Sequence, residues 1–156
     1  MKQSRVVQTI CLSLSVVGAV VAGYLAVAHY TSPSLLVCSD RGMVDCAQVT
    51  SSPQSVVLGV PVADLGALFF VAMSILNLPP LWRSSAPIVR GARLGLVWVG
   101  MGSVLWLIYA ELFLVHAICL YCSLVHAVTF ALFVLIVFHN GEENAVRTPD
   151  TGARHA

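Results

Sequence analysis

Residues 94 to 138 read LGLVWVGMGSVLWLIYAELFLVHAICLYCSLVHAVTFALFVLIVF. The stretch is almost continuously apolar, and its only acidic, basic or imidazole side chains are those of Glu111, His116 and His126. As one α-helix it would be about 67 Å long, roughly twice the thickness of a hydrocarbon core. It must therefore fold back once, and we expect the reversal between Glu111 and His116, with both side chains solvated.

The composition indicates a membrane protein. Of the 156 residues, 58% are hydrophobic and only 10% are charged, whereas a soluble domain carries about 25% charged residues. We therefore predict an all-α integral membrane protein whose helices lie in the lipid bilayer. The net charge of +1 gives no reason to expect a nucleic-acid partner.

Four membrane spans are predicted, at about residues 7–30, 62–78, 94–110 and 117–138. The first apolar run is too long for the core of a cleaved signal peptide, so we interpret it as a retained span. Residues 1–140 are then one four-helix bundle, with an outer loop at 31–59 capping its end. Residues 141–156 are predicted to be a polar, disordered tail.

The basic residues give the expected topology. One side of a four-span bundle would hold seven of them, namely Lys2, Arg5, Arg83, Arg90, Arg93, Arg147 and Arg154. The other side would hold Arg41 alone. Because basic residues favour the cytoplasmic side, both termini are predicted to be cytoplasmic and the loop at 31–59 extracytoplasmic.

Four of the five cysteines fall on the outer side in two pairs. Cys38 and Cys46 lie in the loop, and Cys119 and Cys122 open the last span. A CxxC motif places two thiols on one face of a helix turn, and a position near a helix N-terminus favours the thiolate. This setting is typical of a redox dithiol, although packed thiols are an alternative. Cys11, near the cytoplasmic end of the first span, is interpreted as such a packed thiol.

The order of these motifs resembles the vitamin K epoxide reductase (VKOR) family, including its bacterial homologues, over about residues 6 to 138. The matching features are a C-x7-C loop pair, a serine six residues later, and a CxxC at the start of the fourth span, at Cys38, Cys46, Ser52, Cys119 and Cys122. Gly59-Val60-Pro61 and Gly66 also match the start of the second span in bacterial members.

The resemblance implies an enzyme that transfers electrons by thiol–disulfide exchange to a membrane quinone. Cys38 would meet a redox partner, Cys46 would pass electrons to Cys119, and Cys122 would react with the quinone. The quinone would be menaquinone, ubiquinone or vitamin K. Many bacterial members carry a fused thioredoxin-like domain, and none follows the fourth span here, so a separate thioredoxin-like partner is expected.

The resemblance also implies a location and a direction. In a bacterial inner membrane, the active site would face outward and support disulfide formation in exported proteins. In an endoplasmic reticulum setting, the same relay would reduce vitamin K epoxide.

Four further residues are candidates for quinone binding. Ser52 matches the family, whereas Val62 and His126 stand where many members have an Asn and a Tyr that bind the quinone. His126 is also an ionisable residue inside a span, four residues after Cys122. Asp64 would enter the membrane at a similar depth, and two roles are open for it: pairing with His126, or satisfying backbone donors at a helix start.

Three other interpretations remain open. The loop pair would be a permanent structural disulfide in a non-enzymatic scaffold. Four thiols would close one tetrahedral metal site, although C-x7-C is too wide for a short chelating turn. A second family of four-span disulfide oxidases also uses quinone, but it has the CxxC in the first outer loop and the spaced pair in the second, the reverse of the order found here.

Overall fold

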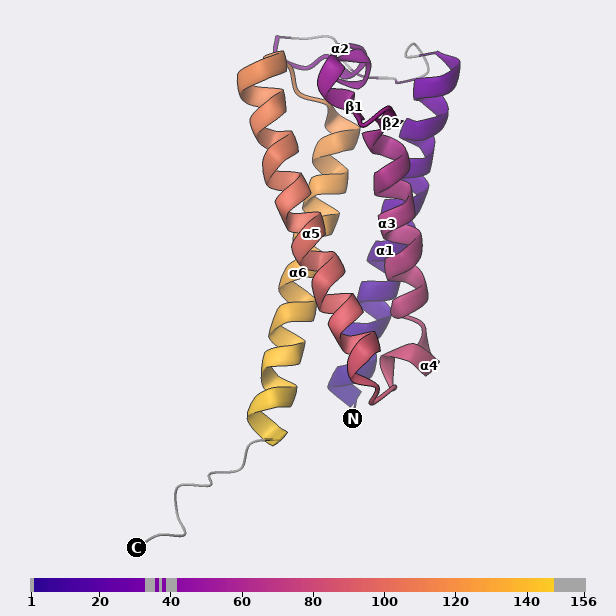
Figure 1. The fold of residues 1–156 in the computed structure, drawn as a ribbon, viewed down its shortest axis with the longest axis vertical. Coiled ribbons are helices and arrows are strands. Elements are labelled where there is room, and N and C mark those ends of the chain that lie inside the picture. The colour runs from indigo at the N-terminus through magenta and orange to yellow at the C-terminus, as the bar shows by residue number, and fades with distance from the viewer. Residues whose placement is uncertain (1, 33–35, 37, 39–41, 148–156) are drawn as a thin grey trace, which may run out of the picture.

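Four helices lie side by side along the length of the molecule (Figure 1): α1 (Lys2–Thr31), α3 (Val62–Leu76), α5 (Pro87–Tyr109) and α6 (Leu120–Arg147). The computed structural model describes residues 2–32, 36, 38 and 42–147. The beginning of α1 and the end of α6 lie at one end of the molecule, and α2 (Cys46–Ser51) lies at the other. Arg41 and Arg154, which the topology prediction used, fall outside the described residues.

Three helices of the described chain are long and apolar enough to cross a membrane: Ser4–Thr31, Pro87–Val115 and Leu120–Gly141. Helix α3 is apolar but has 15 residues, which span about 22 Å and fall short of a hydrocarbon core of about 30 Å. The helical membrane protein predicted from composition therefore agrees with the structure, while the count of four spans stays a prediction.

The helices differ from the predicted spans at their ends. Helix α5 begins at Pro87 rather than near Leu94, because Pro is well suited to a first helical position and the buried Arg93 donates to the carbonyl of Leu76 at 2.7 Å. The helix continues through a π-helical segment, Ala110–Val115, and ends at His116 in the left-handed conformation, with φ of 58°. The chain reverses between His116 and Cys119, later than predicted.

The predicted tail also begins too early. Helix α6 runs to Arg147, because residues 141 to 147 contain no proline and a helix that is already formed extends at little cost. The remaining part of the predicted tail, residues 148–156, lies outside the described residues.

The segment before α3 contains regular structure that the sequence did not predict. After α2 come a 3₁₀ turn, Pro53–Ser55, and a hairpin of β1 (Val56–Val57) and β2 (Val60–Pro61). Val57 pairs with Val60, and the two turn residues, Leu58 and Gly59, both have positive φ, as a two-residue hairpin turn requires. This hairpin leads directly into α3.

Within the described part of the chain, the buried residues form two hydrophobic clusters. One joins the four long helices and contains Cys11, Ala22, Phe70, Met73, Val97, Val128, Leu132 and Ile136. Cys11 is fully buried there, which agrees with its interpretation as a packed thiol. The other cluster contains Leu25, Ala28, Leu36, Cys46, Val49, Ala117 and Cys119. Two cysteines of the predicted relay therefore lie in one core.

Close packing of α1 on α3 depends on Gly18. A Cβ atom at this position would overlap the ring of Phe70, which is fully buried, whereas a Cβ at Gly23 of the same helix would have no atom within 4 Å. Gly18→Ala should lower the free energy of unfolding by about 1–3 kcal/mol through overpacking. Gly23→Ala, the matched control, should leave it unchanged or raise it slightly. Thermal unfolding in detergent checks this pair, and equal melting temperatures for the two variants would contradict the packing described.

Candidate active site

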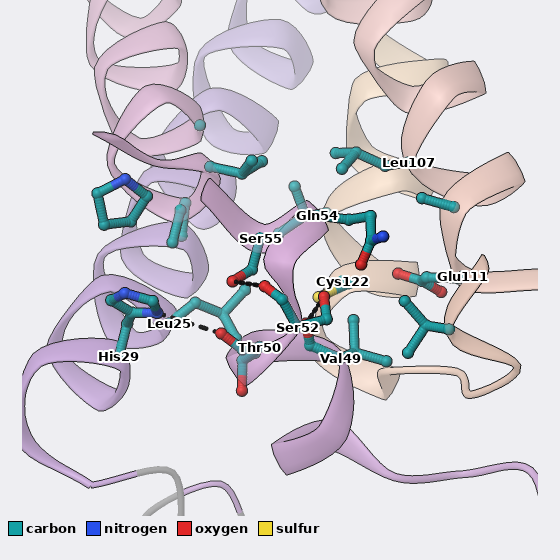
Figure 2. A pocket seen from close by; sticks show the side chains of 18 of the residues that line it. Leu25, His29, Val49, Thr50, Ser52, Gln54, Ser55, Leu107, Glu111 and Cys122 are labelled. Carbon is teal, nitrogen blue, oxygen red and sulfur yellow. Dashed lines mark hydrogen bonds between the residues drawn. The ribbon is translucent and has the colours of Figure 1, made fainter. Parts of the chain in front are cut away.

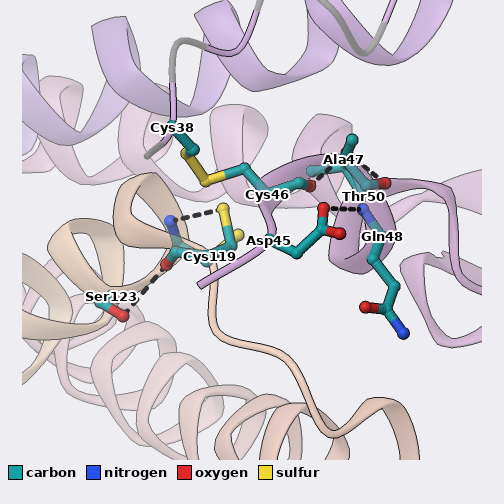
Figure 3. Close-up of a disulfide and its surroundings, with 9 residues drawn as sticks. Cys38, Asp45, Cys46, Ala47, Gln48, Thr50, Cys119 and Ser123 are labelled. Carbon is teal, nitrogen blue, oxygen red and sulfur yellow. Dashed lines mark hydrogen bonds between the residues drawn. A yellow bond between two sulfur atoms is a disulfide. The ribbon is translucent and has the colours of Figure 1, made fainter. Parts of the chain in front are cut away.

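The loop cysteines are joined to each other. Cys38 and Cys46 form a disulfide with their Cα atoms 6.0 Å apart (Figure 3). Cys46 is the first residue of α2, whose N-terminus is capped by Asp45: the Asp45 carboxylate accepts the backbone N–H of Gln48 at 2.8 Å. The capped helix thus fixes the position of one sulfur of the disulfide, and that cysteine is fully buried.

Backbone hydrogen bonds dock this loop against the CxxC motif. The N–H of Asp45 donates to the carbonyl of Ile118 at 3.2 Å, and the N–H of Ile118 donates to the carbonyl of Met43 at 2.8 Å. Val44 and Ile118 thereby form a parallel bridge. Cys46 directly follows Asp45 and Cys119 directly follows Ile118, so these hydrogen bonds bring both cysteines into the same buried cluster. Figure 3 shows Cys119 beside the loop disulfide.

The CxxC cysteines are free thiols at the start of α6. The backbone N–H of Cys122 donates to the sulfur of Cys119 at 3.3 Å. Cys119, which precedes the membrane helix, has a thiol pKa below its usual value, mainly because the Cys122 side chain also donates to its sulfur. A lower pKa gives more thiolate at neutral pH, and the thiolate is the form that attacks a disulfide.

A cavity of about 120 Å³ opens beside Cys122 (Figure 2). It is lined by residues of α1, α3, α5, α6 and the segment before α3, and four of the predicted site residues are among them: Ser52, Val62, Cys122 and His126. Ser52 donates to the carbonyl of Val49 at 2.8 Å, and its oxygen lies in the cavity wall. The structure therefore brings these four predicted residues together.

An apolar groove of about 900 Å³ adjoins the cavity between α3 and α5. The cavity and the groove share five lining residues, Val62, Gly66, Leu107, Val125 and His126. The groove adds aromatic and aliphatic walls, including Phe69 and Trp106. A small polar-edged cavity continuous with a long apolar groove suits a ligand with a polar ring and a hydrocarbon chain.

Asp64 lies apart from the other candidates. Its carboxylate accepts a hydrogen bond from the hydroxyl of Tyr30 at 2.6 Å, and Asp64 lines neither the cavity nor the groove. The suggested pairing with His126 is thus absent, because the end of α1 supplies a donor on another face of α3.

Glu111 is the cavity residue that sequence reasoning misjudged. It was expected to be solvated at the chain reversal, yet it is only 7% exposed and lines the cavity. The signal that could have identified it is the general one that an ionisable residue inside an apolar span is a functional candidate. His116 is exposed, as expected. The cavity lining also includes His29, Thr50 and Gln54, which had no signal in the sequence.

The described residues contain no group of three or more His, Cys, Asp or Glu side chains arranged to hold a metal ion. Two of the four thiols considered for a metal site are joined in a disulfide. The metal-binding interpretation therefore gains no support from the described part of the chain.

The chain has helices long and apolar enough to cross a membrane, and a loop disulfide docked on a CxxC motif. These features define the class of membrane thiol–disulfide proteins. The model of the vitamin K epoxide reductase family matches residues 9–137, and the chain belongs to this family. Membership implies a quinone-linked thiol oxidoreductase. A search of curated proteins found no match.

The Asp45 cap should hold Cys46 in place. Asp45→Ala removes the acceptor for Gln48 N–H and should destabilise α2 by about 1 kcal/mol. The amides of Gln48 and Val49 should then exchange roughly fivefold faster, because α2 opens more often. Asp45→Asn, the matched control, keeps a capping oxygen and should exchange at nearly the parent rate. Hydrogen–deuterium exchange measures both, and unchanged protection in Asp45→Ala would show that the cap does not stabilise α2.

Proposed function

We propose that the protein oxidises a thioredoxin-like partner and passes the electrons through two cysteine pairs to a membrane quinone. The observation that carries this proposal is the contact between the pairs: the Cys38–Cys46 disulfide is docked on the CxxC motif, and Cys122 of that motif lines a cavity. The four cysteines thus belong to one packed cluster, and one of them, Cys122, lines the cavity.

The electrons move by two thiol–disulfide exchanges. A partner dithiol reduces the Cys38–Cys46 disulfide and leaves as a disulfide, with two thiols now on the loop. The Cys46 thiolate then attacks Cys119 of an oxidised CxxC, forms a mixed disulfide and releases Cys122 as a thiolate. Cys38 attacks Cys46 in turn, which restores the loop disulfide and leaves Cys119 and Cys122 reduced. The structure has this last arrangement, a loop disulfide with a free CxxC.

The cavity residues would hold the quinone ring beside Cys122. His126 and Ser52 supply polar atoms at the cavity wall, and Val62 supplies an apolar contact. The groove between α3 and α5 would take the hydrocarbon chain. The quinone, as the final acceptor, takes two electrons and two protons and becomes a quinol, while Cys119 and Cys122 close into a disulfide. Menaquinone, ubiquinone and vitamin K share this chemistry.

The sidedness of the basic residues supports an extracytoplasmic active site with both termini in the cytoplasm. In the inner membrane of a bacterium, this arrangement serves disulfide formation in exported proteins, and the redox partner is a separate thioredoxin-like protein. Under the alternative direction, in an endoplasmic reticulum membrane, the same reduced Cys119–Cys122 pair would reduce vitamin K epoxide.

Cysteine variants test the order of the relay through quinone reduction. The purified protein in lipid nanodiscs receives a reduced thioredoxin-like partner and a short-chain quinone, and quinol formation is followed by absorbance. Cys122→Ala should fall to the uncatalysed background with any donor, because the cysteine beside the quinone is gone. Cys38→Ala should be inactive with the partner but regain activity with a small membrane-permeant dithiol.

Cys11→Ala is the matched control, since Cys11 is buried in the other core cluster, and it should keep the parent rate at a temperature where it is folded. Absence of quinone reduction by the parent, or full activity in Cys122→Ala, would contradict the proposed function.

A further inference from the structure

We propose that Glu111 is the proton-transfer group of the quinone site, carrying a proton between the Cys122 thiol and the quinone oxygen. The inference rests on the proposed function and names a residue that the relay of cysteines does not contain. It is carried by the position of Glu111 in the cavity wall, by its surroundings and by the chemistry that the reaction requires.

The local backbone turns this carboxyl inward. Glu111 lies in the π-helical segment Ala110–Val115, and short π-helical insertions occur frequently at functional sites. The next three residues, Leu112, Phe113 and Leu114, are 40%, 63% and 44% exposed, whereas Glu111 is 7% exposed. The apolar side chains therefore face outward and the one carboxyl of the segment faces the cavity, where Figure 2 shows it with Gln54 and Cys122.

The described part of the cavity lining offers the carboxyl no Lys or Arg as a counter-ion. The other titratable residues of that lining are His29 from α1 and Cys122 and His126 from α6. Cys119, at the start of α6, donates its backbone N–H to the Glu111 carboxyl. A buried carboxyl without a counter-ion is costly to keep ionised, so its protonated form, which can donate a proton, is favoured.

The reaction needs such a group. When Cys119 and Cys122 close into a disulfide they give up two electrons and two protons, and the quinone gains both as it becomes a quinol. Electrons pass from sulfur to the ring, but each proton must reach a ring oxygen inside a largely apolar cavity. Glu111 gives its carboxyl proton to one quinone oxygen and takes the Cys122 thiol proton in its place, and the same exchange with the Cys119 thiol proton supplies the second oxygen, so Glu111 ends the cycle in its starting state. No further oxidant or reductant is consumed.

A purely structural role is the competing explanation, because the hydrogen bond from Cys119 N–H also steadies the chain reversal. Glu111→Gln separates the two roles, since the amide oxygen still accepts that hydrogen bond but the side chain no longer exchanges a proton. Glu111→Asp keeps the carboxyl on a shorter stem. His116→Asn is the matched control: His116 is a titratable but exposed residue of the same reversal, and Asn tolerates its left-handed backbone conformation.

The test follows quinol formation from a small dithiol and a short-chain quinone between pH 5 and 9, with the full chain in nanodiscs. Glu111→Gln should lower the turnover rate by about 10²-fold or more, the usual contribution of a positioned acid–base group, and should lack one ionisation seen in the parent profile. Its Cys119–Cys122 disulfide should still be reduced by the dithiol at the parent rate. Glu111→Asp should keep the ionisation at a displaced pH, and His116→Asn should match the parent.

The outcomes separate the two proposals. A parent that reduces no quinone contradicts the proposed function, and the role of Glu111 falls with it. An active parent together with a Glu111→Gln variant of equal rate and equal pH profile overturns the role of Glu111 and leaves the relay intact. If Glu111→Gln does not fold, Glu111→Asp decides, because a pH profile identical to that of the parent overturns the inference and a displaced ionisation supports it.

Discussion

Two backbone hydrogen bonds join the outer segment of the chain to the CxxC motif, and the rest of the site depends on them. Asp45 donates to Ile118, and Ile118 donates to Met43. Each bond contributes only about 1 kcal/mol, but together they set the register between two segments that are 73 residues apart at Asp45 and Ile118. The loop disulfide and the CxxC then share one core, in which Cys46 and Cys119 are both fully buried.

The long helices pack unequally, and this leaves a cavity and a groove next to the core that holds Cys46 and Cys119. Helices α1 and α3 pack closely where Gly18 lets the ring of Phe70 approach. Helices α3 and α5 leave an apolar groove between them that leads to the cavity beside Cys122. Because the groove between α3 and α5 adjoins the cavity beside Cys122, a hydrophobic ligand bound in it would reach the CxxC motif.

Much of this arrangement follows from the sequence by simple physical rules. The length of the apolar stretch from residue 94 to residue 138 required a reversal, and the spacing of Cys122 and His126 placed both on one helix face, where the structure has them lining one cavity. The order of the cysteine motifs indicated the family, and the pairing of Cys38 with Cys46 was implied by that resemblance.

Other features depended on contacts that no local pattern encodes. The inward turn of Glu111 results from a π-helical segment, which ordinary 3.6-residue periodicity does not predict. Asp64 bonds to Tyr30 across two helices, a choice of partner that only the assembled bundle settles. The strands β1 and β2 have two residues each, too few for an alternating pattern to be recognised.

The central claim is that Cys46 and Cys119 exchange a disulfide directly, and trapping that bond tests it most directly. In the Cys38→Ala/Cys122→Ala double variant, both cysteines that could resolve a Cys46–Cys119 bond are gone, so mild oxidation should join Cys46 to Cys119. The matched Cys46→Ala/Cys122→Ala variant leaves Cys38 and Cys119, which should stay unlinked. Alkylation followed by peptide mass spectrometry identifies the linked pair. The account predicts a Cys46–Cys119 peptide in the first variant. Free Cys46 and Cys119 there, or a Cys38–Cys119 bond of equal yield in the second variant, would contradict it.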